Sequence, residues 1–381
     1  MRFCTEWGRA GHSVASRSVV WALAACVVFV EIGTAFGSQG AAPRTPQRVS
    51  ARWAITELGR LRSGSEVRAF NSTGAVVGDV TPANSVAGKP FGAFAWRHGR
   101  STLLSTRPYS VAVAINERGQ IVGNTDDTRG PALWESASAK KPVRLLGLIA
   151  TPEAINVHGQ IAGERPDAAG NWHAVIWENA TTLIDLGTLG GTFSEAFGIN
   201  DLQQVVGTSS NGRGYNQAFL GQSGQMSNLI PPSPGGVSAV DSSGGIVLDR
   251  RFDPAAINHD GQVAGACVGK KLAADGNYVT HPCVWQAGKL LDLGTLTGDA
   301  VGAATGINDQ DQVVGWVAAA ANSTRRAFVW QNGIFTALPI LPGGASVNEA
   351  LAISDSGLIL GVNESKNLSR VAVVQWTRKS T

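Results

Sequence analysis

The sequence predicts an all-β fold, a seven-bladed β-propeller of four-stranded antiparallel blades, and three observations lead to it. A ten-residue phrase recurs seven times with an average spacing of about 47 residues, a typical length for a propeller blade. Short apolar segments after each copy bring the number of strands per repeat to four. The last copy lacks a fourth strand, and a segment near the start of the chain has the form needed to supply it.

The recurring phrase consists of a small residue, Ile or Phe, Asn or Ser, four variable residues, two apolar residues and Gly. Its copies begin at Ala69, Ala114, Ala154, Gly198, Ala256, Gly306 and Ala352. The Asn opens a tight turn between two strands, and a glycine such as Gly119 provides the left-handed conformation that a type I turn with a bulge requires. Gln203 and Asp311 replace this glycine in two copies, and we expect mild strain there because a Cβ disfavours positive φ.

The third and fourth strands follow from two further patterns. Six of the seven third strands end in Trp, and we expect these side chains to fill the wedge-shaped gaps between blades. The seventh copy ends at Trp376 without a fourth strand, whereas residues 55–61, before the first copy, have the same form as residues 183–189. The N-terminal segment is therefore expected to pair beside the strand ending at Trp376 and remove the open sheet edges.

Residues 1–37 have the pattern of an export signal. Three arginines precede an apolar run at residues 19–30, which is too short to span a bilayer comfortably. Small residues at Ala35 and Gly37 then place cleavage before Ser38. Two alternatives stay open, because residues 23–26 also match a bacterial lipoprotein signal with Cys26 as the lipidated residue, and the segment could remain as an uncleaved anchor.

The chain is thus divided into a signal peptide at 1–37, a linker at 38–52 and a propeller at 53–378. We expect a monomer that is secreted, periplasmic or at the cell surface. It would touch a membrane only through its signal or a lipid on Cys26. Only Cys267 and Cys283 lie in the mature chain, and an oxidising compartment favours a disulfide between them, with free buried thiols as the alternative.

Composition supports the fold and excludes one class of partner. With 47 glycines, 15% charged residues and 43% apolar residues, the chain has the turns and the core material of many short buried strands. The net charge is only +3 and the basic residues are scattered, so no surface that tracks phosphates is indicated. Nucleic acid is therefore not an expected partner.

The repeats resemble those of a bacterial extracellular family, the HAF family, named for a His-Ala-Phe triplet. The resemblance rests on residues 185–191, 198–200, 205–207 and 326–330, and the triplet appears in varied form at 173–175, 217–219 and 326–328. It covers roughly residues 53 to 376. It implies an exported repeat protein, and it brings no catalytic residues to these positions.

The face that carries the more variable loops is where we expect a ligand, because binding is usually placed on variable loops of a rigid scaffold. Aromatic and basic residues of these loops are the candidates for contacts with a carbohydrate or another protein. They are Arg129, Arg165, Trp172, Arg213, Tyr215, Lys270, Lys271, Tyr278, Arg325 and Arg326. Any one of them can equally be a solvated loop tip.

The sequence predicts no catalytic residue, no metal ligand and no cofactor. His173 and His281 occupy matching places in two repeats, but zinc needs three or four convergent ligands. Asp185 and Asp292 also match, and we interpret them as hydrogen-bonding groups at strand ends, although paired carboxylates can serve as a glycosidase acid and base. We therefore expect a binding protein, and the alternative is an extracellular polysaccharide hydrolase or lyase with carboxylates near the axial funnel.

Overall fold

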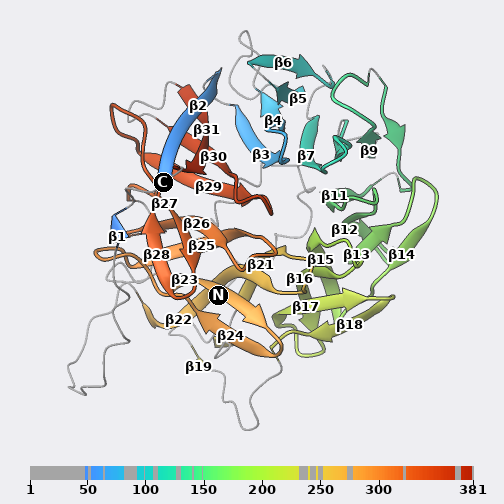
Figure 1. Cartoon of the computed structure of the whole chain (residues 1–381). Coiled ribbons are helices and arrows are strands. Elements are labelled where there is room, and N and C mark those ends of the chain that lie inside the picture. The colour runs from blue at the N-terminus through green and yellow to red at the C-terminus, as the bar shows by residue number, and fades with distance from the viewer. Residues whose placement is uncertain are drawn as a thin grey trace, which may run out of the picture.

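The computed structural model shows seven four-stranded antiparallel sheets arranged as blades around one axis (Figure 1). It describes residues 48–49, 53–62, 65–80, 92–97, 99–105, 110–125, 130–139, 141–147, 149–230, 239–240, 246–247, 252–272, 278–320, 323–364 and 370–379. The predicted signal peptide and its possible lipid on Cys26 lie outside these residues. Within them, no helix is long and apolar enough to cross a membrane.

The first four blades follow the chain in simple meander order. Blade 1 is β3 (Glu66–Phe70), β4 (Val76–Val80), β5 (Gly92–Arg97) and β6 (Arg100–Leu103). Blade 2 is β7 (Val111–Ile115), β8 (Ile121–Asn124), β9 (Pro131–Trp134) and β10 (Val143–Arg144). Blade 3 is β11 (Thr151–Ile155), β12 (Ile161–Pro166), β13 (Trp172–Trp177) and β14 (Leu183–Asp185). Blade 4 is β15 (Gly190–Ile199), β16 (Val205–Asn211), β17 (Asn216–Gln222) and β18 (Gln225–Asn228).

Blades 5 to 7 repeat this order with two small additions. Blade 5 is β21 (Phe252–Ile257), β22 (Val263–Leu272), β23 (Tyr278–Gln286) and β24 (Lys289–Asp292). Blade 6 is β25 (Val301–Ile307), β26 (Val313–Ala318), β27 (Arg326–Gln331) and β28 (Ile334–Ala337), with β1 (Arg48–Val49) added in parallel to β28. A two-stranded sheet of β19 (Ala239–Val240) and β20 (Ile246–Val247) lies between blades 4 and 5 in sequence.

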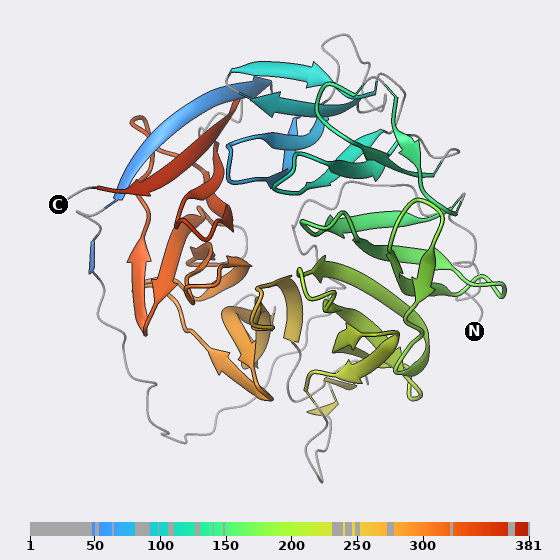
Figure 2. The same ribbon diagram turned by 45° about the vertical axis from the view of Figure 1, so that its right-hand side comes forward.

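Blade 7 joins the two ends of the described chain. It contains β29 (Val347–Ile353), β30 (Ile359–Glu364), β31 (Arg370–Arg378) and, as its outermost strand, β2 (Trp53–Arg62). Ile55 pairs directly with Trp376, so the N-terminal strand lies where the sequence predicted it. Figure 2 shows the blue β2 lying along the red β31. The prediction of a seven-bladed propeller is confirmed.

The glycine that ends each phrase is required by a β-bulge in the innermost pair of strands. All seven of these pairs shift register at the same place. In blade 4 a Cβ built on Gly207 would lie only 1.9 Å from the main-chain oxygen of Glu195. The tight turns behave as expected too, since Gln203 and Asp311 adopt φ values of 60° and 56° in place of glycine.

The core lies in the gaps between blades. Trp134 of blade 2 packs with Val77 and Ala95 of blade 1, and Trp376 of blade 7 packs with Val314 and Val329 of blade 6. Both tryptophans are 0% exposed. These side chains therefore fill the gaps as the repeat pattern predicted.

The phrase asparagines link successive blades through a chain of hydrogen bonds around the axis. In blades 1 to 6 the side-chain Nδ2 donates to the main-chain oxygen of the matching residue of the next blade, at 2.9 to 3.1 Å. The side-chain Oδ1 meanwhile accepts from its own turn, as in the bonds to Asn116 from the amides of Arg118 and Gln120. Blade 7 has Ser354 at this position, and a serine has no side-chain amide that could donate toward blade 1.

Candidate functional site

The ring has two faces that differ in how regular they are. The phrase turns share one face, called here the turn face, with the turns between third and fourth strands. Contacts between the two kinds of turn show this, because Gln120 Nε2 donates to Glu135 at 2.8 Å and Gln331 Nε2 donates to the main-chain oxygen of Gln310 at 3.0 Å. The opposite face, the loop face, carries the connections between second and third strands and those between blades. It is the candidate functional site.

The hairpins that rise toward the loop face are longest in blades 4 and 5. The second strands there have seven and ten residues, whereas those of the other blades have four to six. Lys270 and Lys271 lie in β22 and Tyr278 in β23, so these three residues belong to strands and not to a loop as the sequence suggested. Their side chains, and Arg129 entirely, lie outside what the structure describes.

Two hairpin tips on this face are held by side chains that accept backbone hydrogen bonds. At the tip between β12 and β13, Asp167 Oδ1 accepts from the amides of Ala169 and Asn171, each at 2.8 Å. The hydrogen bonds with Asn171 are the main cause that lowers the pKa of Asp167. At the tip between β16 and β17, Asn211 Oδ1 accepts from the amides of Arg213 and Tyr215 at 2.9 and 3.1 Å. The shared geometry fixes the conformation of both tips.

Four of the predicted ligand-binding residues lie on these two hairpins. Arg165 lies in β12 and Trp172 in β13, and not in a loop as the sequence suggested. Trp172 pairs with Pro166, and Arg165 pairs with His173, at the loop-face end of blade 3. Arg213 and Tyr215 lie in the tip of blade 4, where Arg213 is exposed and Tyr215 is half-buried. The structure thus places an aromatic and a basic residue at each of two rigid tips on consecutive blades.

The other two described candidates, Arg325 and Arg326, are engaged in ion pairs. Arg325 pairs with Glu349 of blade 7 and lies 4.2 Å from the ring centroid of Trp316. Arg326 Nε donates to Asp299 at 3.0 Å, and its Nη2 donates to the main-chain oxygen of Thr297 at 3.2 Å. Arg325 thus links the segment before β27 to β29 of blade 7. Arg326 lies in β27, and not in a loop as the sequence suggested, and it links that strand to the segment that leads into blade 6.

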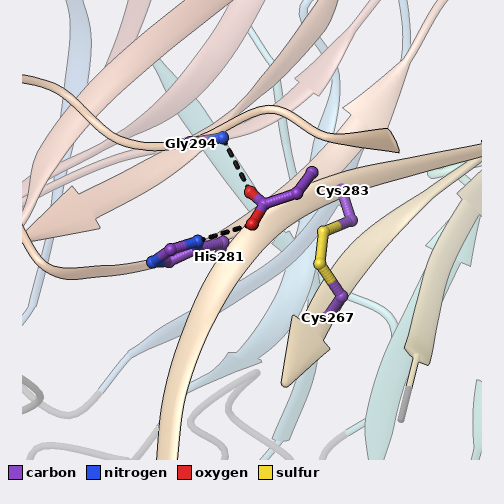
Figure 3. Close-up of a disulfide and its surroundings, with 5 residues drawn as sticks. Cys267, His281, Cys283 and Gly294 are labelled. Atoms are coloured by element: carbon purple, nitrogen blue, oxygen red, sulfur yellow. Dashed lines mark hydrogen bonds and ion pairs between the residues drawn. A yellow bond between two sulfur atoms is a disulfide. The ribbon is translucent and has the colours of Figure 1, made fainter. Parts of the chain in front are cut away.

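Each of the two matched histidines bonds a carboxylate of its own blade. In blade 3, His173 Nδ1 lies 3.2 Å from Asp185, whose Oδ1 accepts from the amide of Gly187 at 2.7 Å. In blade 5, His281 Nδ1 lies 2.9 Å from Asp292, whose Oδ1 accepts from Gly294 at 2.8 Å (Figure 3). The aspartates therefore make the hydrogen bonds at strand ends that their repetition suggested.

The charges of the blade 5 pair affect each other. The hydrogen bond that His281 donates to Asp292 is the main cause that raises the pKa of His281 above its ordinary value. Burial by itself would raise the pKa of Asp292, but the hydrogen bond and charge of His281, together with the hydrogen bond from Gly294, outweigh it, so that pKa is lowered. The protonated imidazole and the ionised carboxylate therefore favour each other.

A disulfide joins Cys267 to Cys283 beside this pair, with a Cα–Cα distance of 5.7 Å (Figure 3). Cys267 is 8% exposed and Cys283 is 0% exposed. The two sulfurs and a carboxylate oxygen of Asp292 lie within 4.8 Å of one another, and they are the one group of three metal-ligating atoms found among the described residues. His173 and His281 do not come together in such a group.

Carboxylates occupy one register position on several innermost strands, five residues before the phrase Asn or Ser. Glu195 and Asp253 are buried there, and Glu66 and Glu349 are partly buried.

Two of these carboxylates have charged neighbours on the second strand of their blade or beside it. In blade 1, Arg68 Nε donates to Asp79 at 2.8 Å and its Nη2 to Glu66 at 3.1 Å. Burial is the main cause that raises the pKa of Asp79, against the opposing effect of Arg68. In blade 7, burial and then the charge of Glu349 raise the pKa of Glu364.

Comparison with known proteins gives similarities of backbone only. No family model matches this chain, and no curated protein matches its sequence. The β-propeller domain of the Trilobed protease from Pyrococcus furiosus, described as having an open velcro topology, is 13% identical over 72% of this chain and 81% of that chain, with a TM-score of 0.47. A puromycin-hydrolyzing peptidase from Mycobacterium tuberculosis is 10% identical over 82% of this chain and 53% of that chain, with a TM-score of 0.48. A putative TolB from Agrobacterium tumefaciens is 11% identical over 73% of this chain and 94% of that chain, with a TM-score of 0.44.

Proposed function

We propose that this chain is an exported binding propeller that takes a carbohydrate on the loop face of blades 3 and 4. The observation that carries the proposal is the pair of hydrogen-bonded hairpin ends on consecutive blades. One carries Trp172 and Arg165 on opposite sides of its sheet, and the other carries Arg213 and Tyr215 in its tip. An aromatic ring offers an apolar face to a sugar ring, and its fixed position keeps the entropy lost on binding small. The neighbouring guanidinium groups offer several donors to hydroxyl or carboxylate oxygens.

Export is supported by the N-terminal sequence and by the cysteine pair. Stable disulfides are typical of oxidising compartments outside the cytosol. A monomeric propeller that is secreted, periplasmic or held at the cell surface is consistent with this, and so is the resemblance of the repeats to the HAF family.

Binding to a panel of neutral and acidic polysaccharides, measured by affinity electrophoresis and isothermal titration calorimetry, tests the proposal. We expect Trp172→Ala and Tyr215→Ala each to weaken binding by about ten-fold or more, the loss of an aromatic contact at a binding hot spot. Arg118→Ala on the exposed turn face is the matched control and should bind like the wild type. Binding that survives both aromatic substitutions, or that is found for a protein ligand alone, would overturn the carbohydrate proposal.

A hydrolase acting on an extracellular polysaccharide is the second candidate, and one observation favours it. Glu349 on the innermost strand of blade 7 is ion-paired, and it contributes to the raised pKa of Glu364. A carboxyl group with a raised pKa beside a second carboxyl group is what a glycosidase uses as its general acid. Release of reducing sugar from the same polysaccharides, abolished by Glu364→Gln and retained in Arg118→Ala, would establish this activity, and no release by the wild type would remove it.

A further inference from the structure

Four side chains of blade 5 project from the same side of the sheet near its loop-face end. Cys267 pairs with His281 across β22 and β23, and Cys283 pairs with Asp292 across β23 and β24. His281 and Cys283 are two residues apart in β23, and in a strand such residues lie on the same side. Directly paired residues on neighbouring strands share that side as well. The register therefore brings two thiol sulfurs, an imidazole and a carboxylate together from three adjacent strands.

The distances between these groups suit a metal ion. The two sulfurs and a carboxylate oxygen of Asp292 lie within 4.8 Å of one another, and His281 Nδ1 lies 2.9 Å from Asp292 Oδ2. Zinc binds sulfur at about 2.3 Å and nitrogen or oxygen at about 2.0–2.2 Å in a tetrahedron, which places its ligand atoms roughly 3.3 to 3.8 Å apart. The imidazole of His281 is not part of that group of three, so it has to turn toward the sulfurs to join them once the bond between the sulfurs is open.

The surroundings of the four groups are also those of a metal site. Asp292 Oδ1 accepts from the amide of Gly294 at 2.8 Å, and the imidazole of His281 has a further backbone hydrogen bond at Ala300. Outer contacts of this kind orient metal ligands. The sulfurs are buried, whereas the side chain of Asp292 is 52% exposed and provides a route from solvent.

We propose that the reduced chain binds one Zn²⁺ at Cys267, Cys283, His281 and Asp292, and that formation of the disulfide releases the ion. A dithiol reductant supplies two electrons and two protons, so that the disulfide becomes two thiols while the dithiol becomes a disulfide. Zn²⁺ then displaces both thiol protons, because the ligands are thiolates. A two-electron oxidant reverses the sequence, since the sulfurs cannot bond to each other and hold the metal together.

Blade 3 offers an internal control, because it has the same His–Asp pair without the cysteines. His173 there pairs with Arg165, and Asp185 pairs with Val175, at the places that Cys267 and Cys283 occupy in blade 5. Asp167 also lies near His173, but it faces Nε2 at 3.8 Å whereas Asp185 faces Nδ1, so these groups do not converge on one ion and the thiolates are missing. Blade 3 is therefore expected to bind no zinc.

The experiment is a Co²⁺ titration of the full chain after reduction with dithiothreitol and anaerobic removal of the reductant. We expect one equivalent of Co²⁺ to give thiolate-to-cobalt charge-transfer absorption, Zn²⁺ to abolish it by displacement, and the oxidised protein to give none. Bound Zn²⁺ should also slow the reaction of both thiols with Ellman's reagent.

Four variants identify the ligands. Cys283→Ser should abolish the charge-transfer band, and His281→Gln and Asp292→Asn should each weaken Co²⁺ binding by about ten-fold or more. His173→Gln should bind Co²⁺ like the wild type. No charge-transfer band in the reduced wild type, whether it is folded or unfolded by circular dichroism, would overturn the proposal. Wild-type affinity in both His281→Gln and Asp292→Asn would overturn it too, because two cysteines alone would then account for the binding.

Discussion

The turn face and the loop face are stabilised in different ways. On the turn face one device repeats, in which a buried asparagine of each blade from 1 to 6 donates to the main chain of the next. On the loop face each link occurs in one particular place: the disulfide joins two strands within blade 5, and the ion pair of Arg325 with Glu349 joins blade 6 to blade 7. The repeat thus gives the turn face the same junction between successive blades. The loop face is free to vary in sequence and is stabilised by individual links.

Loss of the disulfide should have the largest effect on stability. Its cysteines are separated by 16 residues in sequence. Closing a loop of that size restricts the unfolded chain by about 3 kcal/mol. We expect Cys267→Ala combined with Cys283→Ala to lower the free energy of unfolding by about that amount in urea denaturation. An unchanged free energy would mean that the loop face gains no stability from its most specific link.

Breaking one link of the asparagine chain should cost somewhat less. Asn156 makes four hydrogen bonds, donating to Asn200 and Gln160 and accepting from His158 and Gln160. Asn156→Ala leaves buried partners unpaired, so the free energy of unfolding should fall by about 2 kcal/mol. Arg213→Ala, on the exposed loop face, is the comparison and should change it by under about 0.5 kcal/mol. Equal changes in the free energy of unfolding for the two substitutions would contradict the proposed difference between the faces.

Completing the asparagine chain should stabilise the ring. Ser354 occupies the seventh position, and its Oγ already accepts from the amide of Leu358 at 3.2 Å, as the asparagine Oδ1 does elsewhere. Ser354→Asn adds an amide that can donate to the main-chain oxygen of Asn71, and we expect a gain of about 1 kcal/mol in urea denaturation. Ser356→Asn is the control, because residue 356 lies in the same turn but does not match the asparagine position of the other blades, and it should bring no such gain.

The smallest expected effect is the pH dependence of the His281 and Asp292 pair. The raised pKa of His281 contributes stability that is complete below its ordinary value of 6.5 and is lost as pH rises through the folded value. The lowered pKa of Asp292 contributes stability above its ordinary value of 3.8, which is lost as pH falls through the folded value.

The pair is therefore most stabilising between about pH 4 and 6.5. Because Asp292 is half exposed, the contribution should stay below about 1 kcal/mol. Asp292→Asn keeps the hydrogen bond from Gly294 and should flatten the profile of unfolding free energy in that window. A profile identical to that of the wild type would show that the ion pair adds nothing.

Much of the fold could be predicted because its signals are local and repeated. The seven phrases, the turns at Gln203 and Asp311, and the closing segment at 55–61 all follow from short patterns that recur along the chain. The role of the asparagine amide was missed, because an Asn that opens a turn looks complete within its own blade. The one available hint was the use of Asn at six of seven positions where Ser or Asp would also open the turn.

Neighbours across strands were harder to predict, because they depend on register. The sequence suggested comparing His173 with His281, which match in the repeat but lie in different blades and bond different carboxylates. The pairing of His281 with Cys267 and of Asp292 with Cys283 became visible only in the ladder of blade 5. For the same reason Lys270, Lys271 and Tyr278 were expected in a loop, whereas two long strands contain them.

The pairing of β2 with β31 is the central claim, since it makes the chain a closed ring, and a designed disulfide tests it most directly. Thr56 and Gln375 are direct partners across these strands. We expect the double substitution Thr56→Cys and Gln375→Cys to form a disulfide on mild oxidation, detected as a linked peptide by mass spectrometry. Thr56→Cys with Ser227→Cys, which places the second thiol in blade 4, should stay unlinked. Failure of the first pair to link in the folded protein, or equal linking of both pairs, would contradict the closed ring.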